Sequence, residues 1–251
     1  MTPLPIVCLV LLAGLTALAA PGEIILLNGT SSAGKSSLAE VLVATSRLKY
    51  EVVSFDDFYH DFQAKHHVSR LSGEQFQDFL TSLYRHARRR SDSGRNVIID
   101  TVEFDRGRDL YCDILVCSNV TMAVVYCPLQ DMLKRVERRN NSGDPLNHRA
   151  VLLCFQQFVE MYKLQSSPGE SVMEKTRTSI LRAALEEAGK KAGSPRNFAS
   201  LYDQYVQAFG IDQDREITIV PKGQYDLVLN TRSKTKKANV RLVEEYVRRR
   251  H

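Results

Sequence analysis

The chain has 251 residues, of which 43% are hydrophobic and 25% are charged, and its formal net charge is +5. This composition is typical of a globular domain with a large core, and it excludes a disordered or low-complexity chain. The basic residues are spread out, and the two dense runs at 88–90 and 248–250 are typical of solvated helix ends, so no nucleic-acid partner is expected. The five cysteines lack zinc-type spacing and predict small buried thiols.

Residues 4–20 form an almost entirely apolar leader, in which Ala17-Leu18-Ala19 is similar to a signal-peptidase site. No lysine or arginine precedes the apolar run, and the run is short for a membrane span. A cleaved export signal, a membrane anchor and a misassigned start codon are the three alternatives, and the sequence leaves them open. We therefore treat residues 1–22 as a leader, the only expected membrane contact, and residues 23–251 as a single domain.

A short apolar run at residues 24–27 predicts a strand that is buried on both faces. The next residues, GTSSAGKS at 29–36, fit the pattern G-x-x-x-x-G-K-[ST] of the phosphate-binding loop, or P-loop. Residues 37–43 then have the composition of a helix. The motif therefore lies between a strand and a helix, which is the context that a P-loop requires.

The residue types of this loop explain its chemistry. The glycines let backbone N–H groups turn inward around a phosphate, and the following helix adds the positive end of its dipole. Lys35, which we expect to be exposed, supplies a cation for the β- and γ-phosphates, and Ser36 supplies a hydroxyl ligand for Mg²⁺. We therefore predict ATP and Mg²⁺ as cofactors, bound by Gly29, Thr30, Ser31, Ser32, Ala33, Gly34, Lys35, Ser36 and Ser37.

Four further runs are typical of strands, at residues 50–55, 96–100, 121–127 and 225–229. Apolar residues at helical spacing predict an amphipathic helix over 73–90, whereas residues 58–60 are typical of a turn. Strands that alternate with helices predict an α/β fold with a parallel sheet. We expect a three-layer P-loop NTPase fold of the nucleotide-kinase type, with a five-stranded parallel sheet and a helical insertion or lid at 163–215.

Two carboxylates follow predicted strands, and ligands of parallel sheets bind outside the carboxyl ends of the strands. Asp100 ends the strand at 96–100, where P-loop enzymes place the carboxylate on the Mg²⁺ side; a capping role is the alternative. Asp56 ends the strand at 50–55, where it would accept the proton of a substrate hydroxyl. Its neighbour Asp57 would then be a helix N-cap or a surface acid.

Arg135 and Arg139 lie four residues apart on one face of a helix predicted over 130–139. Paired guanidinium groups at this place would neutralise the charge of a transferring phosphoryl group. A solvated basic face is the alternative interpretation.

Together these segments resemble the chloramphenicol phosphotransferase-like family of P-loop kinases. The resemblance rests on residues 24–37 (IILLNGTSSAGKSS), 55–57, 97–100 and the Arg135-x-x-x-Arg139 pair, and residues 225–231 look like the family's last core strand. It implies ATP-dependent phosphorylation of a hydroxyl group on a small molecule, with Asp56 as the general base and Arg135 and Arg139 as lid arginines. Residues 163–214 look like an insertion that the compact family members lack.

Two alternative functions remain open. The chain would be a nucleotide or nucleotide-sugar kinase of the zeta-toxin-like type, or, in another class, an ATP-binding regulatory module without a phosphoryl acceptor. The regulatory module would not need Asp56. Use of ATP predicts a cytoplasmic protein, whereas the leader at 4–20 would make it exported or membrane-anchored.

Overall fold

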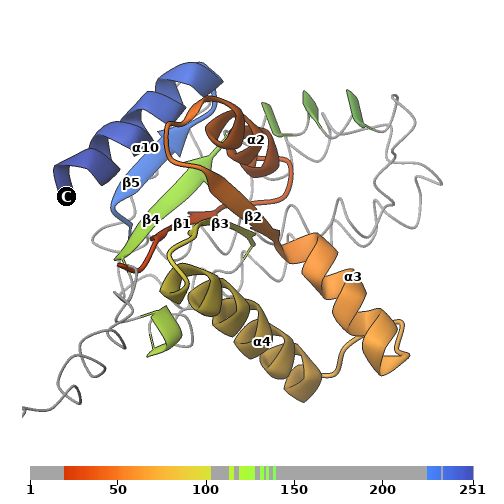
Figure 1. Ribbon diagram of the computed structural model, residues 1–251. Coiled ribbons are helices and arrows are strands. Elements are labelled where there is room, and N and C mark those ends of the chain that lie inside the picture. The colour runs from red at the N-terminus through yellow and green to blue at the C-terminus, as the bar shows by residue number, and fades with distance from the viewer. Residues whose placement is uncertain are drawn as a thin grey trace, which may run out of the picture.

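The computed structural model describes residues 20–102, 113–115, 119–127, 131–132, 134–135, 138–139, 225–232 and 234–250. Its main elements, drawn in Figure 1, are β1 (Glu23–Asn28), α2 (Lys35–Thr45), β2 (Tyr50–Ser54), α3 (Phe55–His66), α4 (Gly73–Asp92), β3 (Asn96–Thr101), β4 (Asn119–Tyr126), β5 (Leu227–Asn230) and α10 (Lys236–Arg250). The leader up to residue 19 and the predicted insertion lie outside the described residues. Within the described ranges, no helix has the length and apolar character needed to cross a membrane.

Five strands form one parallel sheet in the order β2-β3-β1-β4-β5, which confirms the predicted five-stranded parallel sheet and the P-loop NTPase fold. The central strand is β1, in which all six residues are buried and Ile24 pairs with Val97 of β3 and Val120 of β4. Because the P-loop follows β1 directly, it lies in the middle of the carboxyl edge of the sheet.

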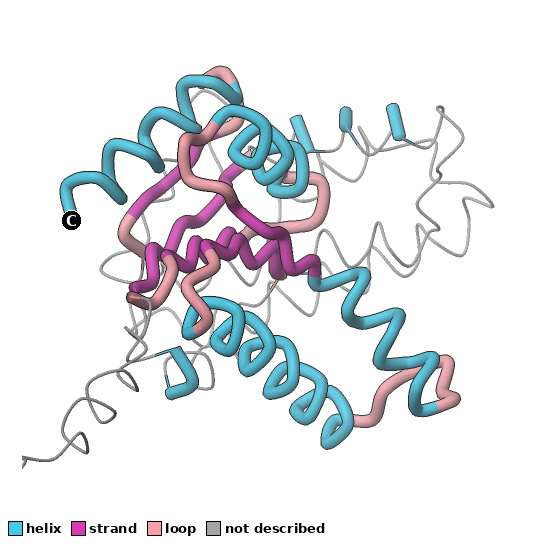
Figure 2. The backbone as a smooth tube through the Cα atoms, viewed as in Figure 1, coloured by secondary structure: helices cyan, strands magenta, loops and turns pink. Residues whose placement is uncertain are grey.

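Helices cover both faces of the sheet and give the expected three layers. Figures 1 and 2 show α2 and α10 over one face and α4 over the other, with α3 leading away from the edge strand β2. Helix α4 buries Phe79, Leu83 and Tyr84 against Ile24 and Leu26 of β1. This contact explains the amphipathic pattern of residues 73–90, because the apolar stripe of the helix is the part that covers the sheet.

The boundary between β2 and α3 differs from the prediction. The strand ends at Ser54, whose hydroxyl caps α3 by accepting the backbone N–H of Asp57 at 3.3 Å. Asp56 and Asp57 therefore lie in the first turn of a helix, where carboxylates are favoured by the positive end of the dipole. The prediction that Asp56 ends a strand is wrong, because β2 ends two residues earlier, at Ser54. The turn predicted at residues 58–60 is wrong too, since these residues belong to α3.

Helix α3 packs through aromatic side chains that recur at helical spacing. Four rings of α3 contact Phe79 of α4, namely those of Phe55, Phe58, Tyr59 and Phe62. Phe79 is fully buried, whereas no residue of α3 is. This ring cluster therefore helps to hold α3, with Asp56 at its start, against α4.

Candidate nucleotide and phosphoryl-transfer site

The P-loop joins the end of β1 to the start of α2, and two glycines fix its shape. A side chain at Gly29 would collide with the carbonyl oxygen of Val125 in β4, so the backbone there must approach the neighbouring strand closely. Gly34 has φ of 103°, a left-handed conformation that favours glycine. These are the two positions at which the motif requires glycine, and the geometry of the loop accounts for both.

Lys35 begins α2, and its side chain is only 7% exposed, so the expectation of an exposed lysine is wrong. Its Nζ donates a hydrogen bond of 3.1 Å to the carbonyl oxygen of Thr30 and lies 3.9 Å from Oδ1 of Asp100. The hydroxyl of Ser36 donates a hydrogen bond of 2.6 Å to Oδ2 of the same carboxylate. The structure thus brings Lys35, Ser36 and Asp100 together at the carboxyl ends of β1 and β3.

Asp100 carries a negative charge in a mostly buried position, since it is 8% exposed. Burial raises the pKa of its carboxyl above the ordinary value, while the charge of Lys35 and the hydrogen bond from Ser36 lower it. The negative charges of Asp56 and Asp57 raise that pKa further. The start of α3 lies next to Asp100, because Ser54 at the end of β2 pairs with Asp100 in β3, and Asp56 and Asp57 are exposed there.

A magnesium ion fits this set of donors. Ser36 and Asp100 present a hydroxyl and a carboxylate oxygen 2.6 Å apart, and Mg²⁺ is held by one or a few protein oxygens together with water and phosphate. A second positive charge would also stabilise the buried carboxylate of Asp100 in its ionised form. Among the described residues, no group of three or more His, Cys, Asp or Glu side chains could hold a metal. The donor set thus suits an ion that binds together with the phosphates of a nucleotide.

The two predicted lid arginines occupy different places. Nη1 of Arg135 donates to the carbonyl oxygen of Ala33 at 2.7 Å and lies 3.4 Å from that of Ser32, and Nη2 donates to the carbonyl oxygen of Thr231 at 3.1 Å. Arg139, one helical turn further on, is exposed. Arg135 therefore contacts the backbone of the P-loop itself.

Three further residues at the P-loop were not predicted from the sequence, namely Asn28, Thr231 and Tyr225. Asn28 accepts the N–H of Gly29 at 2.8 Å through Oδ1, and its Nδ2 donates to the hydroxyl of Tyr225 at 2.7 Å. The hydroxyl of Thr231 donates to the carbonyl oxygen of Ala33 at 2.9 Å. A signal for two of them exists, because Asn28 and Thr231 are polar residues at or just beyond the carboxyl ends of strands, where ligand sites form.

Comparison with solved structures shows the fold. The crystal structure of APE1195 is 17% identical in sequence with a TM-score of 0.52, and the match covers 92% of this chain and 97% of that chain. The APS kinase CysC of Mycobacterium tuberculosis, solved with AMPPNP and APS, is 15% identical with a TM-score of 0.50, and the match covers 91% and 98%. No curated protein matches the sequence.

Comparison with protein families shows what kind of P-loop protein this is. Residues 22–153, more than half of the chain, match the family of chloramphenicol phosphotransferase-like proteins. The matched region contains the P-loop, the start of α3, Asp100 and both arginines, which confirms the resemblance predicted from these segments. The chain is therefore a P-loop kinase of the phosphotransferase type and belongs to the chloramphenicol phosphotransferase-like protein family.

Proposed function

We propose that this protein transfers the γ-phosphate of ATP to a hydroxyl group of a small molecule. The observation that carries the proposal is the convergence of Lys35, Ser36 and Asp100 at the end of β1 and β3. These three groups, together with the inward-facing N–H groups of a P-loop, suit a nucleoside triphosphate and its metal. Membership of a phosphotransferase-like family supports a reaction at the γ-phosphate.

On the nucleotide side, the chain supplies charge and orientation. The ammonium group of Lys35 donates to the carbonyl oxygen of Thr30 within the loop, which supports its assignment to the β- and γ-phosphates. Ser36 and Asp100 would hold Mg²⁺, which, when bound, neutralises the charge that develops on the phosphate oxygens. Arg139 is our candidate for the transferring phosphoryl group, because it is exposed and lies one helical turn from Arg135, which contacts the P-loop.

On the acceptor side, we assign the general base to Asp56. The oxygen of the acceptor hydroxyl forms a bond to the γ-phosphorus while the bond from that phosphorus to the bridging oxygen of ADP breaks. The hydroxyl proton leaves during this attack, and a carboxylate within hydrogen-bond reach can accept it. Asp56 lies in the first turn of α3, is exposed, and its charge acts on Asp100. The use of ATP favours the cytoplasm as the place of the reaction.

The experiment compares Asp56→Asn with Asp57→Asn in the full chain. Both substitutions remove one negative charge from the first turn of α3, so they are matched in size and in effect on the helix dipole. We expect Asp56→Asn to bind ATP like the wild type and to lose about 10²–10⁴-fold in acceptor phosphorylation, and Asp57→Asn to lose much less. A greater loss in Asp57→Asn would move the base to Asp57. Wild-type activity in both variants would contradict the base and favour the regulatory module.

A further inference from the structure

The guanidinium group of Arg135 joins two parts of the chain that lie 198 residues apart in sequence, Ala33 and Thr231. On one side it donates to the carbonyl oxygens of Ala33 and Ser32 in the P-loop, and on the other to that of Thr231, the residue after β5. The hydroxyl of Thr231 lies 2.9 Å from the same carbonyl oxygen of Ala33 and 3.1 Å from that of Tyr126, so its one proton is shared between these two acceptors. The carbonyl of Ala33 therefore accepts hydrogen bonds from both side chains.

This double contact fixes the orientation of one peptide unit of the P-loop. In a trans peptide bond the C=O and the N–H of the following residue point in opposite directions. Holding the carbonyl of Ala33 toward Arg135 and Thr231 therefore turns the N–H of Gly34 to the other side. A P-loop binds phosphate through such inward N–H groups, and Gly34 has no side chain to restrict its own backbone.

The packing around Gly34 shows that the side chains of Arg135 and Thr231 lie directly against this part of the P-loop. A β-carbon at this position would lie 3.2 Å from Nη1 of Arg135 and 3.7 Å from Cγ2 of Thr231. An ion pair also links the segment of Thr231 to the segment of Arg135, since Nε of Arg232 lies 3.3 Å from Oδ2 of Asp131. The segment that carries Arg135 also contacts the loop through Met132, whose sulfur lies 3.6 Å from the hydroxyl of Thr30.

We propose that Arg135 and Thr231 form a brace behind the P-loop that orients the Ala33–Gly34 peptide for phosphate. Arg135 is then a positioning residue for the nucleotide, and the arginine that meets the transferring phosphoryl group is Arg139. This inference deepens the proposed function and rests on it for the role of Arg139, but the brace itself concerns nucleotide binding alone. Arginine suits the position because its planar fork directs two donors at two carbonyls in a fixed geometry, whereas the three donors of a lysine sit on one compact, rotatable ammonium group.

The experiment measures the Kd of a non-hydrolysable ATP analogue with Mg²⁺ by titration calorimetry, and kcat for phosphoryl transfer at saturating ATP. We expect Arg135→Ala to weaken analogue binding about 10–100-fold, since charge-assisted hydrogen bonds are lost, while kcat stays close to that of the wild type. Thr231→Val should weaken binding about fivefold through its lost donor. Thr231→Ser keeps the hydroxyl and should bind normally, whereas Arg135→Lys should recover only part of the affinity.

Arg138→Ala is the matched control, because Arg138 is an exposed arginine on the same segment. The double variant Arg135→Ala/Thr231→Val should lose less affinity than the two single losses combined, because both side chains hold one carbonyl. Unchanged affinity with a kcat lowered about 10³-fold in Arg135→Ala would show a phosphoryl clamp and overturn the brace. Wild-type affinity and kcat in Arg135→Ala and Thr231→Val would overturn it as well. Binding of the analogue needs no acceptor, so a failed acceptor assignment leaves the affinity measurements, on which the brace rests, intact.

Discussion

The hydroxyl of Ser36 lies 2.6 Å from Oδ2 of Asp100, and this hydrogen bond joins the start of α2 to the end of β3. The carboxylate that accepts it is largely buried, and burial is the strongest influence on its pKa, which lies above the ordinary value near 3.8. The folded chain thus keeps a carboxylate in a place that disfavours its charge. Such a cost to stability is typical of functional sites.

The first prediction concerns Asp100→Asn, which keeps the shape of the side chain and removes its charge. Because the pKa of Asp100 is raised in the folded state, its contribution to stability is fully present below the unfolded value and falls as the pH rises through the folded value. We therefore expect the variant to have a higher Tm than the wild type at pH 7 without ligands. It should also bind Mg·ATP about 10–100-fold more weakly.

Thermal melts between pH 3 and pH 8, with and without Mg·ATP, check both parts of this prediction. The difference in Tm between variant and wild type should grow as the pH rises. A lower Tm of Asp100→Asn at pH 7 would show that the contacts with Lys35 and Ser36 outweigh the cost of burial.

The second prediction concerns Lys35→Ala. The variant should lose phosphoryl transfer, and it should also be less stable at neutral pH, because the buried carboxylate of Asp100 loses the cation 3.9 Å away. The double variant Lys35→Ala/Asp100→Asn should recover the stability but not the activity. Urea unfolding and an ATP-consumption assay separate the two effects. A double variant no more stable than Lys35→Ala would contradict the electrostatic explanation.

The third prediction concerns Phe79, the buried ring that four aromatic residues of α3 contact. Phe79→Ala should lower the free energy of unfolding by about 3–5 kcal/mol. Phe79→Leu fills most of the space and serves as the milder control. Since α3 carries Asp56, the alanine variant should also lose more acceptor phosphorylation than nucleotide affinity. Equal losses in both, measured where each variant is fully folded, would contradict this role of α3.

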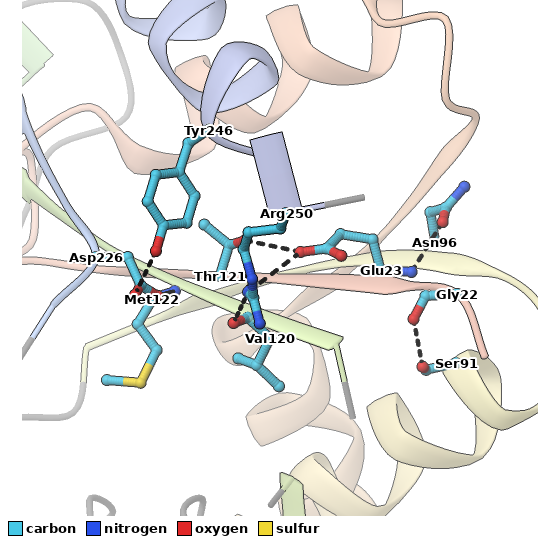
Figure 3. A network of polar contacts seen from close by, with 10 residues as sticks. All are labelled: Gly22, Glu23, Ser91, Asn96, Val120, Thr121, Met122, Asp226, Tyr246 and Arg250. Atoms are coloured by element: carbon cyan, nitrogen blue, oxygen red, sulfur yellow. Dashed lines mark hydrogen bonds and ion pairs between the residues drawn. The ribbon is translucent and has the colours of Figure 1, made fainter. Parts of the chain in front are cut away.

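The fourth prediction concerns the opposite edge of the sheet, which Figure 3 shows from close by. Arg250 of α10 donates to the carbonyl oxygen of Val120 and lies 3.9 Å from the buried carboxylate of Glu23, which the hydroxyl of Thr121 also contacts at 2.7 Å. The side chain of Arg250 is 37% exposed, so Arg250→Ala should cost only about 1 to 2 kcal/mol of unfolding free energy. Its neighbour Arg249 is exposed and provides the control variant.

Nucleotide affinity should not change in Arg250→Ala, because Glu23 begins β1 whereas the P-loop follows its other end. Urea unfolding gives the stability, and titration with an ATP analogue gives the affinity. A weaker nucleotide affinity at full folding would show that this edge communicates with the P-loop.

Strong local patterns made much of the fold predictable. Nearly every residue of β1 and β3 is buried, as their apolar runs predict. The P-loop motif has a residue spacing that is specific to phosphate-binding loops. The place of Asp100 next to the P-loop was predictable as well, since this residue follows the apolar run of β3 at the carboxyl end of the strand. The boundary at Ser54 was predicted wrongly although a signal for it exists, because a serine with aspartates two and three residues later is typical of a helix start.

The contacts of Arg135 were not predictable in the same way. Helical spacing showed that it shares a face with Arg139, but not what lies opposite that face. Its partner Thr231 is 96 residues away in sequence and reaches the P-loop only because β5 pairs with β4. The burial of Lys35 was not predictable either, because no sequence pattern specifies that its Nζ donates to the carbonyl oxygen of Thr30.

The central claim is that the chain moves the γ-phosphate of ATP to the hydroxyl of a small molecule. The most direct measurement incubates the full chain with Mg²⁺, ATP labelled in its γ-phosphate and a panel of hydroxylated small molecules, and follows the label by mass spectrometry. The account predicts that the label becomes covalently attached to an acceptor, with one ADP formed for each product, in the wild type but not in Lys35→Ala. Release of the label only as inorganic phosphate, at a rate that no acceptor changes, would contradict it.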